Sequence, residues 1–335
     1  MNKKTIFIAI IIFLLLAVVV YWDNIAVMFF RPTPDPLLEN QKSKGSVIKN
    51  EFEIIAENLK IPWEIVFLED GDLLVTERPG TVKRIGKDKN VYTIEGVKHV
   101  SEGGLLGMAL HPDFSENQWL YLYFTTKNGE GLINRVERYR FEKNRLSEKK
   151  IIIDKIPGAT HHDGGRIAFG PDGYLYITTG DAGIANLAQD INSLAGKVLR
   201  LKDDGSVPRD NPFGNAVYSY GHRNSQGIAW DNKGSLWATE HGRSGVLSGL
   251  DELNLIEKGK NYGWPIIQGD EKKEGMESSI LHSGPDVTWA PAGLAFFPAS
   301  QSLGAGGSGS LFFGGLRGQS IYQATIINDK KVELK

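Results

Sequence analysis

The stretch Gly158–Gly183 reads G-A-T-H-H-D-G-G-R-I-A-F-G-P-D-G-Y-L-Y-I-T-T-G-D-A-G. Residues 174–179 alternate in side-chain character and are rich in β-branched and aromatic types, which predicts a strand. Pro171-Asp172-Gly173 predicts a tight turn before this strand, because proline presets φ and glycine supplies φ > 0. The stretch therefore predicts a β-hairpin with a polar loop at each of its open ends.

These two loops carry the residues with the clearest chemistry. His161, His162 and Asp163 precede the first strand of the hairpin, and Asp181 follows the second. If the two ends meet, a histidine faces an aspartate across a glycine-lined surface. A carboxylate that holds an imidazole is the usual arrangement of a general base. The alternative, a turn aspartate and two surface histidines, stays open on these residues alone.

The same phrase recurs along the chain from about Val47: an apolar pair, a turn with Asp and Gly or Pro, and a short alternating strand. Its copies are Val66–Glu77, Ala109–Phe124, Ala168–Thr179, Ala229–Glu240 and Ala295–Gly314. Further strands are predicted after most copies, at Thr81–Ile85, Arg135–Tyr139 and Lys197–Leu201. Repeats of roughly 40–65 residues that hold several strands are typical of propeller blades. We predict an all-β propeller, with a β-sandwich as the alternative.

The repeats leave two possibilities for the number of blades. Five copies precede Lys335, so the ring either closes with five blades or lacks part of a sixth. A strand over Phe52–Ala56 is a candidate to complete the last blade, because propellers often close with their first strand.

The N-terminal residues predict a membrane anchor. Lys3 and Lys4 precede an apolar run from Thr5 to Trp22, about 18 residues and close to the minimum for a spanning helix. The lysines predict that this end stays cytoplasmic, and the bulky end of the run argues against a cleaved signal peptide, which remains the alternative. We expect an anchor at 1–30, a linker at 31–46 and an extracytoplasmic propeller domain, periplasmic or at the cell surface, at 47–335.

Composition excludes several function classes. The chain has 335 residues with a net charge of −2 and 23% charged residues, so no basic surface predicts a nucleic-acid partner. It has no cysteine, which excludes disulfides, thiolate metal sites and cysteine nucleophiles.

Polar residues also cluster beside the predicted strands of the later copies. Arg223 and Asn224 lie in Y-G-H-R-N-S-Q-G, where the rigid fork of donors on arginine suits a polyanionic or carbonyl-rich planar ligand. A structural loop paired to a carboxylate is the alternative. Glu240, Asp251 and Glu252 supply oxygen atoms of the kind that Ca²⁺ binds, which is a weak signal alone. Trp264 is expected to serve packing rather than as a sugar platform.

Taken together, the motifs resemble those of the soluble pyrroloquinoline quinone (PQQ)-dependent glucose/aldose sugar dehydrogenases, also called glucose/sorbosone dehydrogenases. The resemblance covers most of Leu59 to Gly318 in collinear order. It rests on Ile61-Pro62-Trp63, Glu102–Gly107 with His111–Phe114, His162–Arg166, Gly180-Asp181, Gly221–Gly227, Asp251–Asn254 and Asn261–Pro265.

This resemblance implies a six-bladed β-propeller, here with an apparently incomplete last blade, that oxidises the anomeric hydroxyl of an aldose to a lactone with hydride transfer to PQQ. It implies that His162 is the base and that Asp181 orients it. Arg223 would polarise the quinone oxygen on which negative charge develops.

The resemblance also implies where the cofactors are held. Glu102, Asn224 and Arg317 fall at cofactor or substrate contacts, and the carbonyls of Gly242 and Arg243 would bind the Ca²⁺ that holds PQQ. The expected partners are an aldose and an external electron acceptor, with the membrane contacted through the N-terminal helix. The sequence specifies neither the sugar nor the oligomeric state. A non-catalytic carbohydrate- or protein-binding propeller and a Ca²⁺-dependent lactonase-like hydrolase are the alternatives.

Overall fold

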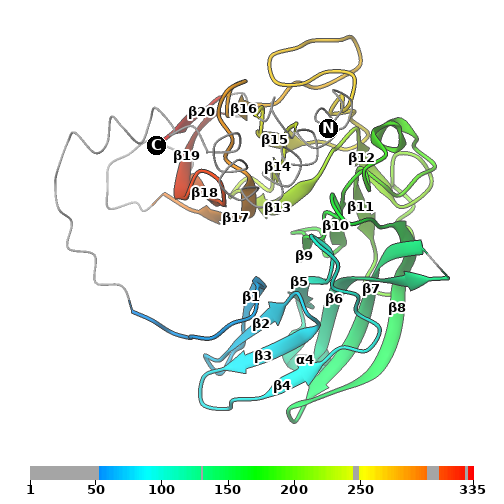
Figure 1. Cartoon of the computed structure of the whole chain (residues 1–335), viewed down its shortest axis with the longest axis vertical. Coiled ribbons are helices and arrows are strands. Elements are labelled where there is room, and N and C mark those ends of the chain that lie inside the picture. The colour runs from blue at the N-terminus through cyan, green and yellow to red at the C-terminus, as the bar shows by residue number, and fades with distance from the viewer. Residues whose placement is uncertain (1–52, 130, 244–248, 300–308, 329–330) are drawn as a thin grey trace, which may run out of the picture.

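The computed structural model describes residues 53–129, 131–243, 249–299, 309–328 and 331–335. In this part of the chain, five antiparallel sheets of four strands each follow one another along an arc (Figure 1). The all-β propeller predicted from the repeats is therefore confirmed.

Each sheet is built from four strands that are consecutive in the chain. The first holds β1 (Pro62–Phe67), β2 (Leu73–Glu77), β3 (Thr81–Ile85) and β4 (Val91–Thr93). The second holds β5 (Leu105–Leu110), β6 (Trp119–Asn128), β7 (Gly131–Glu142) and β8 (Arg145–Pro157), with the short helix α4 (Phe114–Asn117) between β5 and β6. The third holds β9 (Ile167–Phe169), β10 (Leu175–Thr179), β11 (Lys197–Leu201) and β12 (Val217–Tyr220), with the 3₁₀ helix η1 (Ala185–Gln189) after β10. The fourth holds β13 (Ser225–Trp230), β14 (Leu236–Glu240), β15 (Glu252–Ile256) and β16 (Leu281–His282). The fifth holds β17 (Pro291–Phe297), β18 (Ser310–Gly315), β19 (Ser320–Asn328) and β20 (Lys331–Leu334).

Every copy of the repeated phrase forms the hairpin between the first two strands of one sheet. In the third sheet, β9 pairs with β10 so that Ile167 lies opposite Ile177 and Phe169 opposite Leu175. Gly173 in the connecting turn has φ +76°, a conformation that glycine adopts without steric cost. The open ends of this hairpin, which carry His162 and Asp181, therefore lie at the same end of the sheet.

Apolar side chains from facing sheets pack into shared cores. Tyr121 and Tyr123 of β6 and Ile177 of β10 belong to one buried cluster between the second and third sheets. A second cluster joins β2 and β6 through residues such as Leu74 and Leu122. Burial of such apolar surface is the main stabilising contribution to folding, and here it fixes each sheet against the next.

The expectation of six blades is wrong for the described residues, which form five. Each copy of the phrase makes one sheet, and five copies make five. Residues 53–60, which include part of the strand expected to complete the last blade, form no strand. Contacts between strands join consecutive sheets, through β1 with β5, β5 with β9, β10 with β13 and β13 with β17.

The transmembrane helix that was part of the predicted fold is not found among the described residues. Among the residues that the structure describes, no helix is long and apolar enough to cross a membrane. The predicted anchor at 1–30 and linker at 31–46 lie outside these residues, as does the beginning of the domain predicted at 47–335.

Candidate active site

The predicted histidine–aspartate pair is formed. The imidazole Nδ1 of His162 lies 2.8 Å from Oδ1 of Asp181. Their loops are also joined by the backbone, because the Ala182 N–H donates to the carbonyl of His162 at 3.2 Å. Since Nδ1 donates to the carboxylate in this arrangement, Nε2 is the ring nitrogen that retains a lone pair for a proton. His162 therefore has the geometry of a general base whose orientation is set by Asp181.

Asp181 is buried and accepts hydrogen bonds from three loops. Besides His162, the Gly183 N–H donates to Oδ1 at 2.8 Å and the indole Nε1 of Trp264 donates to Oδ2 at 2.9 Å. Burial by itself raises the pKa of Asp181, but the hydrogen bonds from His162, Gly183 and Trp264 outweigh it and hold the pKa below its ordinary value. The carboxylate consequently stays ionised and stabilises a positive charge on the imidazole.

Arg223 lies in the loop between β12 and β13, directly before the fourth sheet, and is also buried. Its Nη1 donates to the carbonyl of His241 at 3.4 Å, and its guanidinium carbon lies 5.3 Å from the centroid of the Trp264 ring. The backbone carbonyl of Arg223 accepts the N–H of Asp181 at 2.8 Å, which fixes the two loops against each other. Burial lowers the pKa of Arg223 despite the nearby Asp181 and Glu240 carboxylates. The cation is therefore poorly hydrated and suited to stabilising a negative charge nearby.

A buried histidine–carboxylate contact holds the Arg223 loop in place. Nδ1 of His222 lies 2.9 Å from Oε2 of Glu240, and the other carboxylate oxygen of Glu240 accepts the backbone N–H of Arg223. The Ser225 hydroxyl also donates to Glu240 at 3.0 Å. Burial raises the pKa of Glu240, but His222 and these donors lower it more strongly, so the group stays ionised. Glu240, a candidate calcium ligand in the sequence, is thus committed to positioning Arg223.

A pocket of about 330 Å³ lies where the five sheets converge. Its polar lining includes Arg78, Glu102, Asp163, Asn224 and His241. Each of the five sheets, or a loop next to it, contributes residues to this lining. The apolar residues include Trp63 of β1, Leu106 of β5 and Pro291 of β17. Its volume is at the lower end of the range typical of small-molecule sites, roughly 300–1,000 Å³.

Glu102 and Asn224 tie the pocket to the His162 loop. Oε2 of Glu102 accepts the backbone N–H of His162 at 2.9 Å. Oδ1 of Asn224 accepts the backbone N–H of Gly164 at 3.0 Å. Both predicted contact residues therefore lie beside the predicted base, and each of them holds its loop.

The predicted calcium ligands lie on the next loop. The Gly242 N–H donates to Oδ1 of Asp251 at 2.8 Å, and the Arg243 carbonyl accepts the N–H of Gly249 at 3.4 Å. The other carboxylate oxygen of Asp251 accepts hydrogen bonds from two further backbone N–H groups, so both oxygens of this side chain are bound by the backbone. In the part of the chain that the structure describes, no three acidic or histidine side chains are grouped to hold a metal ion. Calcium binding at Gly242 and Arg243 stays a prediction.

Arg317 lies on the loop after β18, where its neighbour Leu316 lines the pocket. Its backbone N–H donates to the Trp289 carbonyl at 3.1 Å, which fixes the loop against the fifth sheet. The structure therefore places Arg317 at the rim of the pocket, and its contact with a cofactor stays a prediction.

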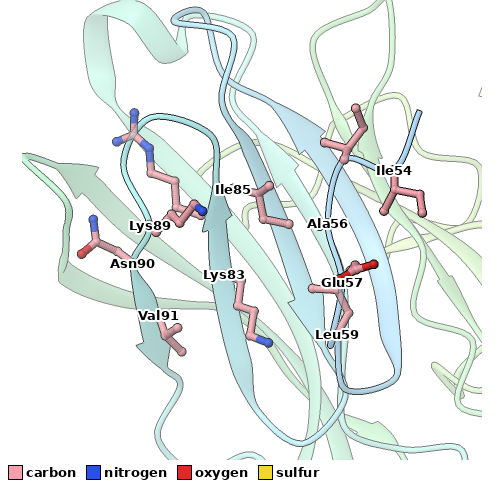
Figure 2. Close-up of a pocket in the computed structure, with 11 residues that line it drawn as sticks. Ile54, Ala56, Glu57, Leu59, Lys83, Ile85, Lys89, Asn90 and Val91 are labelled. Carbon is pink, nitrogen blue, oxygen red and sulfur yellow. The ribbon is translucent and has the colours of Figure 1, made fainter.

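A second, larger groove lies away from this site. It has a volume of about 520 Å³ and runs between residues 54–59 and the strands β3 and β4 (Figure 2). Its lining mixes aliphatic side chains with the cations Lys83, Arg84 and Lys89, of which Lys83 is paired with Glu77 at 2.8 Å and Arg84 with Asp72 at 2.7 Å. Because it contains no histidine–carboxylate pair, its lining offers no acid–base chemistry comparable with that of the central pocket.

Reasoning from the sequence missed three contributors to the site. Trp264 was expected to serve packing, yet its indole N–H holds Asp181. His241 lines the pocket, where burial lowers its pKa and its Nε2 lies 2.9 Å from the Pro291 carbonyl. Arg78 lies on a loop of the first sheet, far from the other motifs in sequence. No spacing within the sequence signals these residues, because Arg78 reaches the site from the first sheet and His241 and Trp264 reach it from the fourth, whereas His162 and Asp181 belong to the third.

Comparison with known proteins is decisive for the family. The family model described as glucose/sorbosone dehydrogenase matches residues 59–335. The chain belongs to the glucose/sorbosone dehydrogenase family. The resemblance inferred from the sequence motifs is therefore confirmed, and membership in a family of sugar dehydrogenases supports an oxidoreductase function.

Relatives and solved structures within this family are similar along most of the propeller. The chain is 34% identical over 278 residues to quinoprotein glucose dehydrogenase B of Acinetobacter calcoaceticus, covering 72% of this chain and 57% of that one. It is 31% identical over 316 residues to an aldose sugar dehydrogenase of Escherichia coli, covering 84% and 82%. The PQQ-bound aldose sugar dehydrogenase of Streptomyces coelicolor superimposes with a TM-score of 0.75 at 36% identity, covering 84% and 83%.

Proposed function

We propose that this member of the family oxidises the anomeric hydroxyl group of an aldose to the corresponding lactone, with PQQ as the electron acceptor. The observation that carries the proposal is the 2.8 Å contact between His162 and Asp181 beside the central pocket. The PQQ-bound Streptomyces structure, 36% identical, supports the choice of cofactor.

The residues around the pocket fit a planar polyanion with carbonyl groups. Arg223, directly before the pocket-lining residue Asn224, offers a poorly hydrated guanidinium, while His241 and Gln226 add polar atoms to the lining itself. Aromatic and aliphatic side chains, such as Trp63 and Leu106, supply apolar surface. When bound, PQQ would supply the two-electron acceptor that takes the hydride from C1 of the sugar.

The protein's own groups would handle the proton and the charge. Nε2 of His162 takes the proton of the anomeric hydroxyl, while Asp181 holds the imidazole and stabilises the cation that forms. Arg223 would hold the quinone oxygen, where its positive charge would favour a developing negative charge, and Asn224 would add a second contact. Glu102, which lines the pocket and accepts the backbone N–H of His162, contacts the substrate or cofactor. Arg317 and a calcium ion on the Gly242 and Arg243 carbonyls complete the proposed cofactor contacts.

The experiment that tests this function is a dye-linked oxidation assay on the purified full chain. PQQ and Ca²⁺ are added separately and together, and glucose and other aldoses are titrated against an artificial electron acceptor. We expect turnover that requires PQQ and is increased by Ca²⁺. A folded protein that binds no PQQ would reject the proposal. The use of an external electron acceptor and the extracytoplasmic location stay predictions from the sequence, which does not name the physiological acceptor.

A further inference from the structure

Arg78 follows β2 and is fixed at the rim of the central pocket by its backbone. Its N–H donates to the Ile61 carbonyl at 3.1 Å, and its carbonyl accepts the Leu105 N–H at 3.0 Å. A Cβ atom on Gly104 would lie 2.3 Å from this carbonyl oxygen, so the close approach of the two loops requires glycine there. The first and second sheets thus hold Arg78 in one place.

The guanidinium of Arg78 is unusual among the charged groups of the pocket. With the described residues it makes neither a hydrogen bond nor an ion pair, and its Nε is shielded from water. Arg166, which also lines the pocket, is by contrast fully engaged: it pairs with Glu64, donates to the Gln226 carbonyl at 2.9 Å and lies over the Trp63 ring. Because a partly buried cation without partners is costly, Arg78 is poised to bind a ligand.

Two acidic side chains lie near Arg78 but form no hydrogen bond or ion pair with it among the described residues. Glu102 and Asp163 both line the pocket and interact with the guanidinium electrostatically. Glu102 accepts the backbone N–H of His162, and Asp163 is the residue directly after His162. Oδ2 of Asp163 is buried and has no hydrogen-bond partner among the described residues. Arg78 therefore lies on the side of the pocket that carries the base.

The charges on this side determine which ligand it suits. The single positive charge of Arg78 is opposed by the carboxylate of Glu102, and Asp163, whose pKa is raised by burial, adds further acceptor oxygens, so this side has no excess positive charge to attract an anion. A guanidinium only donates hydrogen bonds and a carboxylate only accepts them, whereas a sugar hydroxyl does both. A donor next to acceptors is thus matched to neutral hydroxyl groups.

We propose that Arg78 is a specificity-determining residue that, together with Glu102, binds hydroxyl groups of a neutral aldose beside His162. The inference rests on the proposed function and names the substrate contact of that same site. It assigns Arg78 to the sugar rather than to the cofactor.

The test measures binding of glucose and of glucuronate, its anionic counterpart, by calorimetry on the full chain. The wild type is compared with Arg78→Gln, which removes the charge, and with Arg78→Lys, which keeps it. Arg140→Gln, on the outer surface of β7, is the control. PQQ affinity is titrated by fluorescence for each protein, and circular dichroism confirms that each variant is folded.

We expect Arg78→Gln to weaken glucose binding about 10- to 100-fold, the range for one hydrogen bond to a charged group. Arg78→Lys should lie between it and the wild type, while Arg140→Gln and all PQQ affinities stay within about twofold of the wild type. Wild-type protein should also bind glucose more tightly than glucuronate.

Three outcomes would overturn the inference: unchanged glucose binding in Arg78→Gln, a loss confined to glucuronate, or weakened PQQ binding in place of weakened sugar binding. Failure of the proposed function is distinguishable from these. Arg78-dependent binding of glucose by a protein that oxidises no sugar would support the inference and reject the reaction.

Discussion

Asp181 accepts hydrogen bonds from His162, Gly183 and Trp264, so both of its oxygens are held by groups from different loops. Trp264 contributes the donor from the fourth sheet, and its ring also lies beside the Arg223 guanidinium. Trp264 thereby connects the proposed base His162, through the carboxylate of Asp181 that orients it, with Arg223, which is proposed to stabilise negative charge.

Replacing Trp264 by phenylalanine separates these contributions, because the ring stays and the indole N–H is lost. We expect kcat for sugar oxidation to fall about 3- to 10-fold, the equivalent of one hydrogen bond of about 1 kcal/mol. The pH profile of kcat should shift as well, since Asp181 loses a donor that lowers its pKa. The measurement is kcat and KM across pH. A purely structural role would instead lower thermal stability and leave the pH profile unchanged.

Glu240 makes stability depend on pH in acid. Its pKa is lowered in the folded protein, so below its ordinary value of 4.5 the unfolded chain binds more protons than the folded one. The stabilisation that Glu240 contributes should therefore be complete above about pH 5. It should be lost as the pH falls toward and through the lowered pKa.

Urea unfolding of wild type and Glu240→Gln between pH 6 and pH 3 tests this dependence. At pH 6 the variant should be less stable by about 3 kcal/mol, because His222 and the Arg223 N–H lose a buried ionised partner. Its stability should also change less with pH than that of the wild type. If both proteins lost the same free energy of unfolding between pH 6 and pH 3, other carboxylates would be the cause of the acid sensitivity.

At the scale of elements, the turn aspartate of the repeated phrase is bound to an arginine of the third strand. In the third sheet, Asp172 accepts two hydrogen bonds from Arg200 at 2.9 and 3.0 Å, and Arg200 also contacts Asp210 at 3.0 Å. Asp72 and Arg84 repeat this contact in the first sheet at 2.7 Å. The aspartate that signals the turn in the sequence therefore also joins the hairpin to the next strand.

Removing this link should destabilise the blade. Arg200→Ala is expected to lower the free energy of unfolding by about 2–3 kcal/mol, because its guanidinium is largely buried among charged partners. Arg140→Ala is the matched control: Arg140 pairs with Glu142 and Glu148 at the surface and should cost less than about 1 kcal/mol. Denaturant unfolding of both variants measures the difference. Equal losses would contradict the role assigned to the turn.

The sequence predicts a contact of the fold or of the site where the residues that form it lie close together in the chain. The hairpin that contains Ile167 and Ile177 is encoded within one short stretch by its turn and alternation, so His162 and Asp181 were brought together correctly from the sequence. Trp264 and Arg78 reach the pocket from the fourth and first sheets. Their distance from His162 depends on how the sheets are placed around the centre, which no local pattern encodes.

At the scale of the whole molecule, apolar side chains are exposed on the first and last sheets. Phe67 of β1 is 74% exposed and Ile321 of β19 is 79% exposed. Consecutive sheets bury such residues between them, whereas no comparable strand contact joins the fifth sheet to the first among the described residues. Exposed apolar patches of this kind promote self-association.

We expect the double variant Phe67→Ser, Ile321→Ser to bind less of an apolar dye and to self-associate less than the wild type. Its free energy of unfolding should change by less than about 1 kcal/mol in total, because both side chains are already in water. Ile184→Ser, which replaces an exposed isoleucine of the third sheet, is the control. Sedimentation velocity and dye fluorescence report the outcome. If Ile184→Ser reduced dye binding and self-association equally, the exposed side chains of the first and last sheets would not be the specific cause of self-association.

The measurement closest to the central claim is the single-turnover reduction of bound PQQ by glucose, followed by rapid-mixing absorbance. It compares the wild type with His162→Gln, a neutral variant of similar size, after both have been shown to fold and to bind PQQ. We predict that the wild type reduces the cofactor and that His162→Gln does so at least about 100-fold more slowly, as expected for loss of a general base. Equal rates in the two proteins would contradict the assignment of His162 and, with it, the mechanism.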